Sequence, residues 1–286
     1  MLRQKQVTVD ILRLDKIHPV VSGNKLFKLH YFLEEAKQAD HKTLLTFGGA
    51  WSNHLVATAF ACNEMGMESI GVVRGEEPAT LSHTLRSCIE LGMKLKFISR
   101  EEYIRKEEKD LIDKLHIEFG DFMLVPEGGY HPLGAKGASL IMSINRVKEY
   151  THICTAVGTA ATLAGLLSGA APAQTIVAIP VLKNFTDINE RLQYLLGDTG
   201  KISRLQVLND YHFGGYAKKT DELIAFMDQC LHDFRLPLDF VYTAKMLYGV
   251  FDSIQKNIFP KGSKVLCLHT GGLQGNSSFT VDSLPA

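Results

Sequence analysis

The sequence predicts an α/β fold in which helices cover open, mostly parallel sheets. Short apolar runs, with the length of buried strands, alternate along the chain with segments whose apolar residues recur at helical spacing. The alternation forms two successive sets, and no linker, internal repeat or low-complexity segment separates them. We therefore expect two α/β units, one of which is inserted into the other or packed tightly against it.

The first set begins with a strand at the N-terminus, where Arg3, Lys5 and Asp10 lie among alternating apolar residues. A helix that starts at Lys25 follows and carries an apolar stripe. The later elements of this set are predicted as strands 42–47, 69–73, 95–99 and 122–125 and as helices 52–66, 79–91 and 101–115. This order of strands and helices is typical of parallel pairing.

The second set begins near Gly137 with a predicted helix over 137–150. Its other elements are predicted as strands 153–156, 175–180, 204–207 and 264–268 and as helices 161–168, 187–196, 220–233 and 244–257. No charged residue occurs from Ile153 to Leu182, but Gly158, Gly165 and Pro172 interrupt this stretch. It is therefore predicted to be a buried strand, loop, helix and strand, and not a membrane span.

The composition indicates a globular protein of the cytoplasm. A chain of 286 residues can bury a sizeable core, and its formal net charge of zero gives no field that favours nucleic acid or a membrane surface. The N-terminus lacks the apolar core of a secretion signal. The five cysteines are never spaced as Cys-x-x-Cys, and the eleven histidines show no metal-binding pattern. We therefore expect neither a disulfide framework nor a metal site.

Lys25 is the first candidate for a catalytic side chain. It follows Gly23 and Asn24 on the opening turn of its predicted helix, where a glycine lets the backbone bend sharply. An amine in this position can attack a carbonyl cofactor, but a lone lysine at a helix start is more often simply solvated. The neighbouring motifs therefore decide between the two interpretations.

A second motif lies where the buried strand 42–47 turns into the helix 52–66. Trp51, Ser52, Asn53 and His54 follow a pair of glycines there. Because a helix N-terminus presents free N–H groups, this turn can bind a substrate carboxylate. Ser52 or Asn53 can equally act as a plain N-cap, and both interpretations stay open.

Three further motifs follow predicted strands or precede helices in the second set. They are Gly158-Thr159-Ala160-Ala161-Thr162, His269-Thr270-Gly271-Gly272, and the pair formed by Tyr216 and Tyr242-Thr243. The first can hold a phosphate with its N–H groups and hydroxyls, although each motif alone is also compatible with packing or a turn. The chain contains no Gly-x-Gly-x-x-Gly and no Gly-x-Ser-x-Gly, which argues against a dinucleotide-binding dehydrogenase and a serine hydrolase.

Together these motifs resemble the pyridoxal-phosphate enzymes of the tryptophan-synthase-β fold (fold type II), in the branch of D-cysteine desulfhydrase and 1-aminocyclopropane-1-carboxylate deaminase. The resemblance covers essentially the whole chain. The matching segments are Gly23-Asn24-Lys25-Leu26-Phe27-Lys28-Leu29, Ser52-Asn53-His54, Thr162-Leu163-Ala164-Gly165 and Gly262 to Leu266 with His269 to Gly272. The chain departs from the family pattern at Trp51 and at Ala160-Ala161, which bears on the choice of substrate.

The resemblance implies a role for each of these residues. Lys25 would bind pyridoxal 5'-phosphate covalently and move protons. Asn53 would contact the phenolic oxygen of the cofactor. Its phosphate and ring would be held by Lys28, Gly158, Thr159, Ala160, Ala161, Thr162 and Thr270. The substrate side would be formed by Trp51, Ser52, Asn53, His54, Tyr216, Tyr242 and Thr243, with Ser52 and the two tyrosines taking part in catalysis.

The resemblance also implies a domain division, an assembly and an activity. We expect a large cofactor domain of residues 1–38 and 131–286, a small inserted domain of residues 39–130, and a homodimer. Thr243 and Thr270 stand where the deaminases carry glutamate and leucine. We therefore expect α,β-elimination from a small amino acid, D-cysteine above all, giving pyruvate, ammonia and sulfide.

Four alternatives remain open from the sequence. Within the same fold, the enzyme could open 1-aminocyclopropane-1-carboxylate or eliminate water from serine. The phosphate loop could instead serve a nucleotide-binding oxidoreductase, or the protein could bind the cofactor without catalysis.

Overall fold

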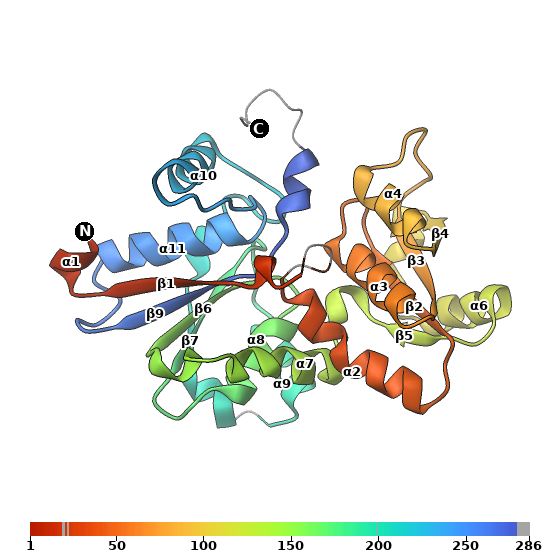
Figure 1. Cartoon of the computed structure of the whole chain (residues 1–286), viewed down its shortest axis with the longest axis horizontal. Coiled ribbons are helices and arrows are strands. Elements are labelled where there is room, and N and C mark those ends of the chain that lie inside the picture. Colours follow the sequence, from red (N-terminus) through yellow and green to blue (C-terminus); the bar gives the residue numbers. More distant parts are fainter. Residues whose placement is uncertain (19–20, 22, 199, 279–286) are drawn as a thin grey trace.

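The structure, a computed structural model, describes residues 1–18, 21, 23–198 and 200–278. In this part of the chain two sheets occur, and all neighbouring strands in them are parallel (Figure 1). The five-stranded sheet contains, in spatial order, β1 (Thr8–Arg13), β9 (Lys264–His269), β6 (His152–Val157), β7 (Thr175–Pro180) and β8 (Leu205–Val207). The four-stranded sheet contains β4 (Met93–Ile98), β3 (Glu68–Arg74), β2 (Thr43–Gly48) and β5 (Met123–Val125).

Helices cover the five-stranded sheet on both faces (Figure 1). On one face lie α10 (Asp221–Phe234) and α11 (Thr243–Gln255), and on the other α7 (Pro132–Ser139), α8 (Ala161–Gly169) and α9 (Ile188–Leu196). Alternate residues of each strand face opposite layers: Cys154 and Cys267 pack toward α10 and α11, whereas Ile153 and Leu266 pack toward α8. Strands buried on both faces read as continuous apolar runs, which explains why the sequence reveals them.

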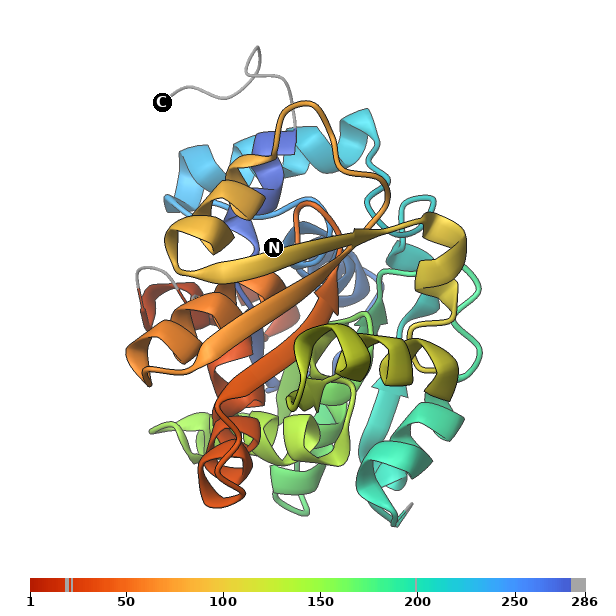
Figure 2. The same ribbon diagram turned by 90° about the vertical axis from the view of Figure 1, so that its right-hand side faces the viewer.

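The four-stranded sheet lies in front of the other sheet in Figure 2. Its helices are α3 (Asn53–Glu64), α4 (His83–Glu90), α5 (Arg100–Ile104) and α6 (Lys109–Phe119). Leu55 of α3 and Leu85 of α4 pack against Val73 on one face of the sheet. Leu111 of α6 packs with Leu45 on the opposite face. The remaining helices are α1 (Leu2–Lys5) and α2 (Lys25–Gln38), and α2 leads from β1 toward β2.

The predicted helix over 137–150 is wrong at both ends. The helix is α7, which begins at Pro132 after His131, whose Nδ1 accepts a hydrogen bond from the Leu133 N–H at 3.2 Å. It ends at Ser139, and short 3₁₀ turns over Leu140–Ser143 and Val147–Glu149 follow. Arg146 has a φ of 68°, a left-handed conformation that no helix can accommodate.

The predicted helix over 101–115 is two helices, α5 and α6. Ser99 caps α5 by accepting the Glu102 N–H at 3.0 Å, and Glu108 stands at the N-cap of α6. The charged run from Arg105 to Glu108 lies between them and offers no apolar side chain that could continue a buried stripe. Two other boundaries also shift: the predicted helix 79–91 begins only at His83, and the first strand begins at Thr8 after α1.

The uncharged stretch from Ile153 to Leu182 forms β6, α8 and β7, as predicted. Among the described residues, no helix combines the length and the apolar character needed to cross a bilayer. The five cysteines are free thiols buried in the cores.

Candidate active site

A cavity lies where the carboxyl ends of strands from both sheets meet. The turns after β1, β2, β6 and β9 all reach it, and parallel α/β sheets place their ligand sites at such strand ends. Its empty volume is about 560 Å³. The polar and glycine residues that line it are Asn24, Lys25, Lys28, Asn53, Gly128, Gly158, Thr159, Thr162, Tyr242, Thr270, Gly271 and Gly272.

The start of α2 is pressed against the turn after β9. Gly23 has a φ of 80°, and a Cβ atom there would lie 1.9 Å from the carbonyl oxygen of Thr270, so only glycine fits. Asn24 connects the two sides, because its backbone N–H donates to Thr270 at 3.3 Å and its Nδ2 donates to Thr162 Oγ1 at 2.7 Å. Lys25 Nζ donates to Asn24 Oδ1 at 2.7 Å. The amine is thus held by a side chain that also bonds Thr162 on α8.

Lys25 has the electrostatics of a nucleophilic amine. Burial lowers the pKa of Lys25 to about 8, against the opposing effect of the Asp239 carboxylate. One turn later on α2, Lys28 is 5% exposed and donates to the Gly128 carbonyl at 2.9 Å. Burial and the charge of Lys25 hold the pKa of Lys28 well below its usual value. Two amines so close together favour an anion between or beside them.

The turn between β6 and α8 offers that anion a row of backbone donors. Ala160 stands at the N-cap of α8 with a φ of 69° and no side-chain cap, which leaves the first N–H groups of the helix available. A Cβ atom on Gly158 would lie 3.3 Å from the ring of Tyr242, so this glycine lets the phenol approach the loop. Thr159 and Thr162 line the cavity, whereas Ala161 is fully buried behind it and can contribute only its backbone.

The N-terminus of α3 brings two polar side chains whose hydrogen-bonding capacity is unused. Asn53 Oδ1 is buried without a hydrogen-bond partner among the described residues, and so are both ring nitrogens of His54. Burial, with the charges of Lys25 and Lys28, lowers the pKa of His54 to about 3, so its ring is neutral. Buried polar atoms are rarely left unpaired, and a bound molecule would supply a partner for Asn53.

Four further predicted residues do not line the cavity, namely Trp51, Ser52, His54 and Tyr216. Ser52 is the N-cap of α3, where its Oγ accepts the Leu55 N–H at 3.4 Å. Trp51 is 42% exposed, with its ring centroid 5.3 Å from that of His83. Tyr216 is 52% exposed, and its ring lies edge-on to Tyr242 with centroids 6.2 Å apart. The plain capping interpretation of Ser52 therefore holds, and a substrate role would be additional.

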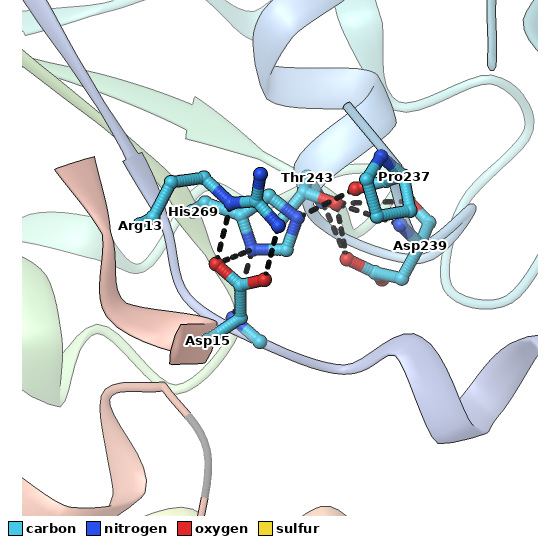
Figure 3. A network of polar contacts seen from close by, with 7 residues as sticks. Arg13, Asp15, Pro237, Asp239, Thr243 and His269 are labelled. Atoms are coloured by element: carbon cyan, nitrogen blue, oxygen red, sulfur yellow. Dashed lines mark hydrogen bonds and ion pairs between the residues drawn. The ribbon is translucent and has the colours of Figure 1, made fainter. Parts of the chain in front are cut away.

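Thr243 is fully buried and does not line the cavity. Its hydroxyl donates to Asp239 Oδ2 at 2.5 Å, and its Oγ1 accepts the Asp239 N–H at 2.8 Å (Figure 3). The predicted contact between Thr243 and a substrate is therefore not supported, because its single proton is already bound to a carboxylate. The same carboxylate accepts the N–H groups of Val241 and Tyr242, at 3.0 and 2.8 Å.

A second buried network fixes the turn after β9 (Figure 3). His269 Nε2 bonds the Pro237 carbonyl at 2.8 Å, and its Nδ1 lies 3.2 Å from Asp15 Oδ1. Arg13 donates two bonds to Asp15, at 2.8 and 2.6 Å. This network ties the end of β1 and the segment before α11 to His269, the residue before Thr270. It thereby fixes one wall of the cavity.

Sequence reasoning missed several residues that shape the site. Asp239 is 1% exposed, and its carboxylate lies 3.1 Å from where a Cβ atom on Gly272 would stand. The sequence feature that could have identified it is its place four positions before Thr243, the first residue of α11. Asn24 lies within the motif Gly23-Asn24-Lys25, but the sequence alone does not show what its side chain bonds. Gly128 lies in a turn with no distinctive pattern.

The arrangement fits a carbonyl compound that carries a phosphate. Lys25 supplies the amine, Lys28 and the turn before α8 supply the anion site, and the unpartnered Asn53 Oδ1 marks space for a polar molecule. Such a ligand would balance the charge of the two lysines and accept hydrogen bonds from the free N–H groups at the start of α8.

Comparison with known proteins agrees with this chemistry. Residues 5–271 match the family described as "Pyridoxal-phosphate dependent enzyme". A putative 1-aminocyclopropane-1-carboxylate deaminase of Thermotoga maritima is 32% identical over 93% of this chain and 88% of its own length. A D-cysteine desulfhydrase of Yersinia pestis is 26% identical over 91% of this chain and 86% of its own. A solved structure described as an "ACC deaminase homologue" superposes with a TM-score of 0.81 at 27% identity, over 96% and 87% of the two chains.

Proposed function

Because the chain belongs to the pyridoxal-phosphate-dependent enzymes, in the branch of the 1-aminocyclopropane-1-carboxylate deaminases and D-cysteine desulfhydrases, we propose that it eliminates sulfide from D-cysteine. Loss of the α-proton and of the β-sulfur, followed by addition of water, converts D-cysteine into pyruvate, ammonia and sulfide. Bound pyridoxal phosphate supplies the electron sink that makes the α-proton acidic. The protein supplies position, charge and proton transfer.

We assign the covalent bond to the cofactor and the proton transfer at the substrate α-carbon to Lys25. With a pKa of about 8, a useful fraction of this amine is unprotonated near neutral pH. Lys28 and the turn Gly158 to Thr162 hold the phosphate, and Asn53 contacts the phenolic oxygen. In this assignment the anion site takes the phosphate, and the Nδ2 amide group of Asn53 is the donor to the phenolic oxygen.

On the substrate side we assign the carboxylate to the start of α3, where Ser52, Asn53 and His54 lie together with Trp51. Tyr242 lines the cavity and Tyr216 lies beside it, so the two phenols would face the reacting carbons. Burial raises the pKa of Tyr242 well above its usual value, which keeps this phenol protonated as a donor. Thr243 is not assigned to the substrate, since its hydroxyl is bound to Asp239.

One observation carries the choice of elimination over ring opening: in the described part of the chain, no acidic residue lines the cavity. Asp239 comes nearest, but its oxygens are directed to the start of α11 and accept four hydrogen bonds there. We propose that Thr270 faces the cofactor ring nitrogen, and a neutral hydroxyl leaves that nitrogen unprotonated. A weaker electron sink suffices when a thiolate departs readily, but it is poorly suited to opening a cyclopropane ring.

The cofactor assignment is tested by reducing the purified, cofactor-replete protein with borohydride and mapping the labelled peptide. The label should be on Lys25. Recovery of the label on another lysine, or no label at all, would contradict the assignment.

The substrate assignment is tested with a panel scored by release of α-keto acid. The panel contains D- and L-cysteine, β-chloro-D-alanine, D- and L-serine and 1-aminocyclopropane-1-carboxylate. D-cysteine and β-chloro-D-alanine should be converted well ahead of the cyclopropane. A preference for the cyclopropane would identify the deaminase activity that several relatives are named for, and a preference for serine would identify a dehydratase. Release from no substrate would favour a protein that binds the cofactor without turnover.

We also propose the division into a large domain, residues 1–38 and 131–286, and a small inserted domain, residues 39–130. The four-stranded sheet, formed entirely between Thr43 and Val125, supports this division, as does the assembly of the five-stranded sheet from both ends of the chain. A homodimer remains our proposal from the family resemblance. Light scattering on the purified protein would measure the mass of the assembly.

A further inference from the structure

Lys245 is a fully buried lysine that the proposed chemistry does not use. It lies on the first turn of α11 with 0% exposure. Its Nζ donates to the carbonyl oxygens of His212 and Gly215, at 2.9 and 2.7 Å. Lysines are almost never fully buried without partners, because removing an ammonium from water is costly. The two carbonyls are therefore the reason that the charge can lie there.

Both carbonyls belong to a sharply turned segment, residues 212–217, which we call the Tyr216 loop. Phe213 and Ala217 have φ values of 50° and 53°, and Gly214 and Gly215 have 90° and 115°. Left-handed conformations at residues with a side chain cost on the order of 1–3 kcal/mol each and persist only where the surroundings enforce them. Within the loop, the Gly214 N–H donates to His212 Nδ1 at 3.0 Å. The ammonium of Lys245 bridges the carbonyls of His212 and Gly215, at the two ends of the turn 212–215.

The loop delivers Tyr216 to the edge of the cavity. The Tyr216 ring lies edge-on to Tyr242, which lines the cavity and closely approaches Gly158. Tyr216 is 52% exposed, so its own packing does little to hold it. Its position therefore depends on the backbone that carries it. In that backbone the Gly215 N–H donates to the His212 carbonyl at 2.9 Å and the Lys218 N–H to the Gly215 carbonyl at 3.1 Å, and Lys245 adds a second, charged donor to each of these carbonyls.

We propose that Lys245 is a positioning residue, whose buried ammonium holds the Tyr216 loop so that Tyr216 and Tyr242 form one wall for the amino-acid substrate. The part that concerns substrate rests on the proposed function, whereas the hold on the loop does not. The charge that faces Lys245 is the carboxylate of Asp239, which opposes the effect of burial. Burial nonetheless lowers the pKa of Lys245 to about 8, consistent with an ammonium held by carbonyls and not by a direct ion pair.

The test compares Lys245→Met with Lys201→Met in the holoenzyme. Methionine keeps the length and removes the charge and the donors. Lys201 is a matched control, because its Nζ also donates to a backbone carbonyl at 2.9 Å, but that carbonyl belongs to Ser168 on α8 and not to the loop. Hydrogen exchange, read by mass spectrometry, should show protection of the Tyr216 loop falling about tenfold in Lys245→Met and unchanged in Lys201→Met.

The kinetic readout separates positioning from chemistry. For the best substrate of the panel, KM should rise about tenfold in Lys245→Met with a smaller change in kcat, since the wall that binds substrate is loosened. Borohydride labelling of Lys25 should remain as in the wild type. If no substrate is turned over by the wild type, the proposed function fails, but the exchange result still decides whether Lys245 holds the loop.

Two outcomes would overturn the proposal: unchanged protection of the loop, or a loosened loop with unchanged KM. Should Lys245→Met not fold, Lys245→Gln replaces it in the same measurements. Glutamine keeps two N–H donors on a shorter, neutral side chain. The protection of the loop and KM should therefore lie between the wild-type values and the tenfold changes expected for Lys245→Met. Wild-type values in Lys245→Gln would likewise contradict a role for the charge.

Discussion

At the scale of single residues, the candidate site is governed by three charges. Lys25 and Lys28 lie one helical turn apart and are largely removed from water, and the charge of Lys25 makes protonation of Lys28 less favourable. Asp239 opposes this effect at Lys25 without lining the cavity. The carboxylate can act at a distance because its field is weakly screened in a buried site.

The first residue-scale prediction concerns Asp239→Asn. The negative charge of Asp239 raises the pKa of Lys25. Without that charge, this pKa should fall below its present value of about 8. In the apoprotein, the rate at which an amine-specific reagent labels Lys25 should therefore reach its half-maximum at a lower pH than in the wild type. Peptide mapping by mass spectrometry measures that midpoint.

Asp252→Asn is the matched control for this experiment. Asp252 lies on α11, where it pairs with Lys256 at 2.7 Å, and it does not contribute to the pKa of Lys25. Its midpoint should equal that of the wild type. Asp239→Asn also weakens the cap of α11, so its free energy of unfolding should fall by about 1–3 kcal/mol, and this is measured separately. An unchanged or higher midpoint would refute the electrostatic role.

The predicted residues that line the cavity near a helix start could be placed from the sequence. Lys25, Lys28 and Asn53 follow glycines and open amphipathic segments, so both their position and their chemistry are local properties of the sequence. Asp239 and Thr243 could not be placed in this way. Whether a threonine faces a ligand or a carboxylate depends on how the segment before α11 turns, and that turn is fixed by side chains such as His269 from another strand.

At the scale of elements, α7 packs between α2 and α8, the two helices to which we assign the anion site. A Cβ atom on Gly137 of α7 would lie 2.0 Å from the carbonyl oxygen of Phe27 on α2. On the other side, a Cβ atom on Gly165 of α8 would lie 2.5 Å from the Ala135 carbonyl oxygen. The three helices therefore pack backbone to backbone, and glycine at these positions sets the distance between Lys28 and the turn before α8.

The element-scale prediction is that Gly137→Ala destabilises the protein and weakens cofactor binding. In an ordinary helix interior this change is stabilising by about 1 kcal/mol, because alanine has the higher helix propensity. Here the methyl group would overlap α2, so we expect a loss of about 1–3 kcal/mol in the free energy of unfolding. Chemical denaturation and a cofactor titration measure the two effects.

Gly200→Ala is the control for Gly137→Ala. The nearest atom to a Cβ at Gly200 is Asp198 Oδ1 at 3.4 Å, an ordinary contact, so both measured quantities should stay close to the wild type. If Gly137→Ala were as stable as the wild type, the close packing of α7 on α2 would not hold in solution.

The elements themselves were predicted unevenly for a physical reason. A parallel strand buried on both faces is a continuous apolar run, and β2, β6, β7 and β9 were all placed within about two residues on that signal. Helix ends depend on caps and backbone turns. His131 caps the start of α7 and the left-handed Arg146 prevents helix over the end of the predicted range 137–150, and apolar periodicity reports neither feature.

At the scale of the whole molecule, the cavity exists only because two sheets bring their strand ends together. Lys28 and Asn53 come from segments on either side of β2, whereas Gly158 and Thr270 come from the five-stranded sheet. A ligand that contacts all of them binds the native state and not the unfolded chain, so it must stabilise the fold by mass action. Comparing this stabilisation between the wild type and a variant that lacks one contact measures how much that contact contributes to ligand binding.

The final prediction uses Lys28→Met, in which removal of one buried cation should have opposite effects on the apoprotein and on the holoenzyme. The pKa of Lys28 is lowered in the folded protein, so the unfolded chain binds this proton more tightly below the ordinary lysine pKa of 10.5. Wild-type apoprotein should therefore be less stable than the variant at pH 7. The difference should shrink as the pH rises toward 10.5, where the unfolded chain also loses its proton.

With pyridoxal phosphate at 100 times the wild-type Kd, the cofactor should add about 2.7 kcal/mol to the free energy of unfolding of the wild type. A tenfold weaker affinity in Lys28→Met would reduce this gain to about 1.4 kcal/mol at the same concentration. Lys37→Met is the matched control, because Lys37 lies on the same helix but is exposed. Lys37→Met should change neither the free energy of unfolding of the apoprotein nor the increase that the cofactor adds to it. Thermal and denaturant unfolding with and without cofactor measure both quantities, and an undiminished gain in Lys28→Met would remove Lys28 from the phosphate site.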